Sequence, residues 1–152
     1  MGTAIVVTSG KGGTGKTSFT AGVGAALALS GLRVLCVDCD IGLRNLDIAL
    51  GLSDAALMDF SDVAQQRCTL ERAVVAHPQL AKLSLLTAPI RQRGQPVTGE
   101  QMASLLRAVR MQYDFCLLDA PAGLGDGFLL ATAAADRCVV VTTADASSLR
   151  DA

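Results

Sequence analysis

Residues Gly10–Thr17 read Gly-Lys-Gly-Gly-Thr-Gly-Lys-Thr and fit the pattern G-x-x-x-x-G-K-[ST]. The apolar run Ala4–Thr8 comes shortly before this stretch, and the helical pattern Lys16–Ser30 overlaps its end. Glycines let successive backbone N–H groups turn toward one point, where a helix N-terminus adds positive potential. A chance match somewhere in a chain of this composition has a probability of about 0.4%. The stretch therefore predicts a strand, a phosphate-binding loop and a helix, in that order.

The same pattern predicts which groups meet the phosphates of a nucleotide. Lys16 would reach the β- and γ-phosphates, and the Thr17 hydroxyl would ligate Mg²⁺. The alternative is a glycine-rich turn that only caps the following helix. The predicted phosphate-binding residues are Gly10, Lys11, Gly12, Gly13, Thr14, Gly15, Lys16, Thr17 and Ser18.

The rest of the chain alternates between predicted strands and predicted helices. Apolar runs without polar alternation are typical of strands buried on both faces. They cover Ala4–Thr8, Arg33–Val37, Asp114–Leu118 and Cys138–Thr142, with a weaker fifth run at Leu83–Thr87. Helical patterns cover Lys16–Ser30, ended by Gly31, then Leu57–Val75, then Gly99–Met111 with Thr98 as its N-cap. This order predicts one α/β domain, residues 1–152, with a mainly parallel sheet flanked by helices.

Carboxylates follow two of the predicted strands. Asp38 and Asp40 come at the end of the second strand, and Asp119 ends the run Phe115–Asp119. Ligands of open parallel sheets bind at the carboxyl ends of the strands, so these side chains can face the phosphates. A lone aspartate in such a loop can also be a turn or cap residue, and Asp47 is interpreted as a local helix cap.

Composition excludes several classes of protein. Hydrophobic residues make up 51% and charged residues 18%, which excludes disorder. A net charge of −1 and an aromatic content of 3% give no reason to expect nucleic-acid binding. Five cysteines favour reduced thiols in a cytosolic protein. Cys36 and Cys39 have C-x-x-C spacing, but strand alternation would point them to opposite faces and disfavours a metal or redox site. His77 is interpreted as a loop residue.

A second lysine in the loop, Lys11, begins a resemblance to a known family. With the stretches Val37–Asp47 and Pro121–Gly123, the loop resembles the deviant Walker A motif of the MinD/ParA family of P-loop ATPases. The resemblance implies ATP and Mg²⁺ as cofactors and an ATP-dependent homodimer, in which Lys11 reaches the partner's phosphates. It also implies that Lys11, Lys16 and Asp40 are catalytic and that Asp40 positions the attacking water. Further, it implies that Thr17, Asp38 and Asp119 surround Mg²⁺ and that a backbone N–H near Gly123 senses the γ-phosphate.

Within the family, the phrase Gly42–Asp47 with its Arg44 resembles the septum-site-determining branch. That branch implies a molecular switch that places the bacterial division septum with the inhibitor MinC and the regulator MinE. It also implies a cytoplasmic location at the inner face of the membrane, reached through a C-terminal helix that these residues do not include. On this resemblance we expect a fold truncated after its fifth strand. The alternatives are a partition-type or flagellar-number regulating ATPase of the same family, or a non-catalytic nucleotide-binding fragment.

Overall fold

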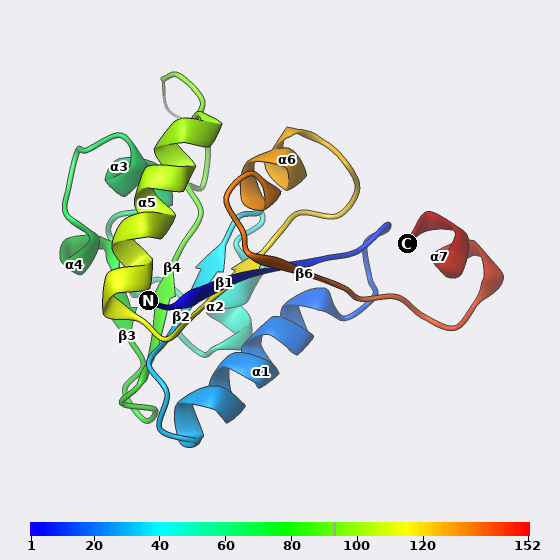
Figure 1. Cartoon of the computed structure of the whole chain (residues 1–152), viewed down its shortest axis with the longest axis horizontal. Coiled ribbons are helices and arrows are strands. Elements are labelled where there is room, and N and C mark those ends of the chain that lie inside the picture. Colours follow the sequence, from blue (N-terminus) through cyan, green and yellow to red (C-terminus); the bar gives the residue numbers. More distant parts are fainter. Residues whose placement is uncertain (93) are drawn as a thin grey trace.

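The computed structural model describes residues 1–92 and 94–152 as a single parallel-sheet fold with helices on both faces (Figure 1). Among the described residues, the sheet has six strands in the order β3-β4-β2-β5-β1-β6, of which only β3 runs antiparallel to its neighbour. The elements are β1 Thr3–Thr8, α1 Lys16–Leu29, β2 Val34–Asp38, α2 Asn45–Ala49, α3 Phe60–Ala64, α4 Leu70–Ala73, β3 Val75–Ala76, β4 Leu83–Leu86, α5 Gly99–Gln112, β5 Phe115–Asp119, α6 Asp126–Thr132, β6 Arg137–Val140 and α7 Ala146–Asp151.

Strand alternation divides the core into two layers, one on each face of the sheet. Leu35 and Val37 of β2 pack with the buried side of α5, whereas Val34 and Cys36 pack with α1 and α2. Figure 1 shows α1 and α2 on one side of the strands and α3 to α6 on the other. The predicted α/β class and the mainly parallel sheet are confirmed.

The long helices agree with the sequence patterns to within a residue or two. Thr98 caps α5, because its side chain accepts from the Gln101 amide while the Gln101 side chain accepts from the Thr98 amide. Gly31 follows α1 with φ +91°, a conformation that suits glycine at the end of a helix.

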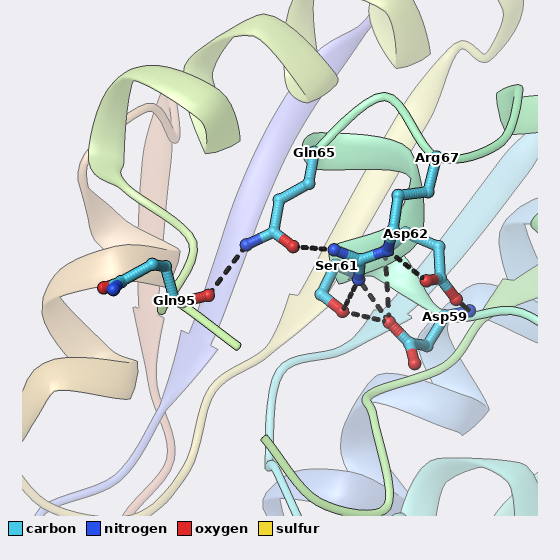
Figure 2. Close-up of polar contacts among 6 residues, drawn as sticks. All are labelled: Asp59, Ser61, Asp62, Gln65, Arg67 and Gln95. Carbon is cyan, nitrogen blue, oxygen red and sulfur yellow. Dashed lines mark hydrogen bonds and ion pairs between the residues drawn. The ribbon is translucent and has the colours of Figure 1, made fainter. Parts of the chain in front are cut away.

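The helical region expected from Leu57 to about Val75 contains two short helices, α3 and α4, with a break between them. Asp59 starts α3 with a capping box, and Gln66 then adopts φ +60°, which no continuous α-helix contains. Figure 2 shows how the side chains after this break fold back, with Arg67 contacting Asp62 and Ser61. The region therefore forms two short helices and the two-residue strand β3, which the sequence did not predict.

The last strand is also less buried than expected. β6 lies at the sheet edge, pairs only with β1 among the described strands, and leaves Cys138 exposed. An apolar run alone therefore did not distinguish an edge strand from a central one. No helix of the described residues is long and apolar enough to cross a membrane.

Two glycines of α1 provide a matched test of how closely this helix packs on the sheet. A Cβ atom on Gly24 would lie 2.6 Å from Cys36 Sγ, whereas one on the exposed Gly22 would meet no described atom within 4 Å. Alanine favours a helix over glycine by roughly 1 kcal/mol. We expect Gly22→Ala to raise the free energy of unfolding by about that amount, and Gly24→Ala to lower it by about 1–3 kcal/mol because the packed layer must shift. Chemical denaturation measures both, and equal stabilisation by the two variants would contradict the packing.

Candidate phosphate-binding site

The loop between β1 and α1 forms a cradle at the carboxyl edge of the sheet. Gly13 and Gly15 have φ of +77° and +86°, which disfavours any other residue, and Gly15 is the N-cap of α1 without a side-chain cap bond. The Thr14 hydroxyl is buried and has no hydrogen-bond partner among the described residues. Free helix N-terminal amides beside an orphaned hydroxyl suit an anionic oxygen ligand.

A hollow of about 480 Å³ lies over this cradle. Seven of the predicted phosphate-binding residues line it, together with Asp40. They are Gly12, Gly13, Thr14, Gly15, Lys16, Thr17 and Ser18. The structure thus brings the loop and the predicted catalytic carboxylate to one cavity.

Beneath the hollow, Asp119 joins the two side chains that were predicted to meet the phosphates and Mg²⁺. Lys16 Nζ lies 2.8 Å from Asp119 Oδ1, and the Thr17 hydroxyl donates to Asp119 Oδ2 at 2.6 Å. Asp119 is 2% exposed. Because Thr17 gives its proton to this carboxylate, its oxygen keeps lone pairs for a cation.

Asp38 and Asp40 occupy different environments. Asp40 is half-buried at the hollow, and burial raises the pKa of its carboxyl while nearby Lys16 opposes that rise. Asp38 is 1% exposed and accepts from the backbone amides of Asp40 at 2.9 Å and Leu46 at 3.1 Å. Burial raises the pKa of Asp38 to about 6 despite these bonds. Asp38 thus lies beneath the loop that carries Asp40.

Lys11 points to α7. Its ammonium lies 3.4 Å from Asp145 Oδ1, and both side chains are partly exposed. Asp145 is the N-cap of α7, and hydrogen bonds from Ser148 and Thr143 hold the pKa of its carboxyl well below the usual range. A Cβ on Gly10 would lie 2.1 Å from the carbonyl oxygen of Asp151, so α7 packs directly against the loop (Figure 1).

The Gly123 amide, predicted to sense a γ-phosphate, already makes a hydrogen bond within the protein. It donates to the Ser9 carbonyl at 3.2 Å, and Gly123 has φ +84°. A contact with phosphate requires this bond to open. The neighbouring Ala122 lines the hollow.

Sequence reasoning missed the part of the site that α2 contributes. Asn45, Ile48 and Ala49 line the hollow, although none of the predicted helical patterns covers them. The prediction that Asp47 caps a helix is wrong in position, because Arg44 is the N-cap of α2 and Asp47 lies in its first turn. Asp47 instead accepts from the Ile48 amide and lies 3.4 Å from the Arg44 guanidinium.

The remaining candidate ligands have structural surroundings. Cys36 and Cys39 are buried in opposite core layers, and burial raises the pKa of Cys36 to about 12. His77 lies in a loop, where its Nδ1 accepts from the amides of Gln79 and Leu80. In residues 1–92 and 94–152, no three His, Cys, Asp or Glu side chains form a candidate metal cluster.

Comparisons with known proteins agree with this geometry. A family model described as an AAA domain matches residues 2–151. The septum site-determining protein MinD of Synechocystis sp. (strain ATCC 27184 / PCC 6803 / Kazusa) is 44% identical over 148 residues, which are 97% of this chain and 56% of that protein. The chain thus spans about half the length of the curated relatives it matches.

Two solved structures extend the similarity to the fold. The MinC:MinD cell division protein complex of Aquifex aeolicus matches 99% of this chain and 60% of its own, with a TM-score of 0.89 and 40% identity. MinD from Pyrococcus horikoshii OT3, complexed with Mg-ADP, matches 99% of this chain and 62% of its own, with a TM-score of 0.84 and 31% identity. The chain therefore belongs to the AAA-domain family of MinD- and ParA-like P-loop ATPases.

Proposed function

We propose that this chain is the nucleotide-binding part of an ATP-dependent switch of the septum-site-determining type, which hydrolyses ATP with Mg²⁺. The observation that carries the proposal is the cluster of the buried Lys16 and Asp119 with the half-buried Thr17, directly under a glycine cradle. The orphaned Thr14 hydroxyl and the open space around Gly12, Gly13 and Gly15 fit a polyphosphate that needs hydrogen-bond donors and close backbone approach. The relative solved with Mg-ADP supports the choice of ligand.

The chain's own groups have distinct tasks in this reaction. The loop amides and Lys16 bind the phosphates, and the positive charge of Lys16 stabilises the negative charge that develops on them in the reaction. Asp119 keeps the Thr17 hydroxyl turned so that its oxygen can meet a cation. Asp40, at the wall of the hollow, accepts a proton of the attacking water and orients it. Mg²⁺, when bound, neutralises phosphate charge and fixes the leaving group.

The switch itself is proposed to be a homodimer formed with ATP, in which Lys11 crosses to the partner's nucleotide. The partial exposure of Lys11 and its long, 3.4 Å ion pair support this, because water and salt weaken an ion pair at the surface and such a pair can open. The proposed partners are a MinC-type inhibitor, after the MinC:MinD complex of a relative, and a MinE-type regulator. The proposed location is the cytoplasmic face of the membrane.

Asp40→Ala tests the catalytic half of the proposal. The variant should bind MgATP within about threefold of the wild type, because no phosphate contact is lost, and should release phosphate roughly a hundredfold more slowly. Nucleotide titration and a phosphate-release assay measure the two properties. Glu100→Ala, which removes an exposed carboxylate from the first turn of α5, is the matched control and should change neither. A parallel loss of binding and turnover in Asp40→Ala would refute this role.

Lys11→Ala tests the switch. The variant should keep its stability and its affinity for nucleotide as a monomer, whereas ATP-dependent dimerisation and hydrolysis should fall together. Light scattering with and without ATP follows the dimer. The control is Lys82→Ala. The chain has three lysines, and Lys82 is the one that lies outside the loop; it donates a hydrogen bond to the Gly31 carbonyl. Normal ATP-dependent dimerisation of the Lys11→Ala variant would contradict this role and would show that Lys11 is a solvated loop residue.

A further inference from the structure

The helix α2 begins without a cap of its own. Its N-cap residue, Arg44, lies in the left-handed region at φ 47° and ψ 56°, and no side chain at that position accepts from the first turn. The first amides of a helix lack acceptors within the helix and are stabilised by a side-chain oxygen. Leu46, the second residue of α2, donates its amide to Asp38 Oδ2 at 3.1 Å. The acceptor therefore comes from the end of β2, eight residues upstream.

The other oxygen of the same carboxylate holds the start of the loop. Asp38 Oδ1 accepts from the Asp40 amide at 2.9 Å. One side chain, 1% exposed, thus binds both ends of the loop formed by residues 39–46. Asp38 itself is fixed by the sheet, where it lies opposite Asp119 in the register of β2 and β5.

The loop held by Asp38 and the helix α2 form part of the wall of the hollow. The loop and the helix that follows it supply Asp40, Leu43, Asn45, Ile48 and Ala49 to the wall of the hollow. A carboxylate also suits the positive end of a helix. Asn45 through Ala49 form barely more than one turn, so the direction of this turn depends on how its first amides are held.

We infer that Asp38 is a positioning residue that closes loop 39–46 by capping α2, and so places Asp40 and the α2 wall of the nucleotide site. This role is additional to the place in the Mg²⁺ shell that the family resemblance implies, because each carboxylate oxygen that accepts one amide keeps a second lone pair. The inference rests on the proposed function only where it identifies the hollow as a nucleotide site. The closed loop exists in the protein without nucleotide and is tested there.

Amide hydrogen exchange, followed by NMR, measures the two bonds directly. In the wild-type chain without ligand, the Asp40 and Leu46 amides should be protected, and exchange at the rate of an unstructured peptide would overturn the inference. Asp38→Asn keeps the shape of the side chain but removes its charge and one acceptor oxygen. Both amides should then exchange about tenfold faster or more, while the Leu117 amide of β5 stays protected. Unchanged exchange, or acceleration of only one of the two, would overturn the closed loop.

Asp59→Asn is the matched control. Asp59 also accepts from two backbone amides, those of Ser61 and Asp62, at the start of α3 (Figure 2). Both bonds go to Oδ1, which an asparagine side chain retains, so this substitution should leave exchange at α3, Asp40 and Leu46 close to that of the wild type.

A wild-type measurement with Mg²⁺ and ADP tests whether Asp38 also holds the loop in the nucleotide-bound state, even if the Asp38 variant does not fold. Protection of Asp40 and Leu46 should persist on binding, and a tenfold drop would overturn the positioning role of Asp38 in the bound state. If the Gly12–Gly15 amides do not respond to Mg²⁺ and ADP, the proposed function fails, while the ligand-free exchange still decides the role of Asp38.

Discussion

The position of Asp119 determines most of this site. β5 lies between β2 and β1, so the parallel register sets Asp119 beside Val7 and Asp38 at the same edge of the sheet. A carboxylate that is 2% exposed there requires a partner, since an unpaired buried charge is strongly destabilising. Lys16 and Thr17 supply that partner from the first turn of α1. The phosphate loop is therefore held to the sheet by the group that also orients the predicted cation ligand.

This arrangement implies competition within the site. The Lys16 ammonium has three donors, one of which lies on Asp119 in this structure. A polyphosphate would share or replace that contact, and the glycine cradle is already shaped for it. Two other contacts would also compete with nucleotide, namely Lys11 with Asp145 and Gly123 with Ser9. Each occupies a group that is proposed to contact phosphate in the nucleotide-bound state. The structure thus has three polar contacts that can exchange when nucleotide arrives.

The sequence predicted the features with a local cause. Gly10–Thr17 specifies its own loop, and the capping box at Thr98 specifies the start of α5, because both depend on neighbouring residues. The failures have non-local causes. α2 is capped by Asp38 across eight residues, and the exposure of β6 depends on which strands lie beside it. Hydrophobic periodicity contains none of this information.

Titration with MgADP of the wild type, Lys16→Gln and the double variant Lys16→Gln/Asp119→Asn tests the central claim most directly, with denaturation run in parallel. The wild type should bind one nucleotide, and Lys16→Gln should bind about tenfold more weakly or worse, because the cation of the cradle is lost. Lys16→Gln also leaves Asp119 buried without its cation, so the free energy of unfolding should fall, and the double variant should recover stability without recovering affinity. Wild-type affinity in Lys16→Gln would contradict the account, since the cluster under the cradle would then be part of the fold alone.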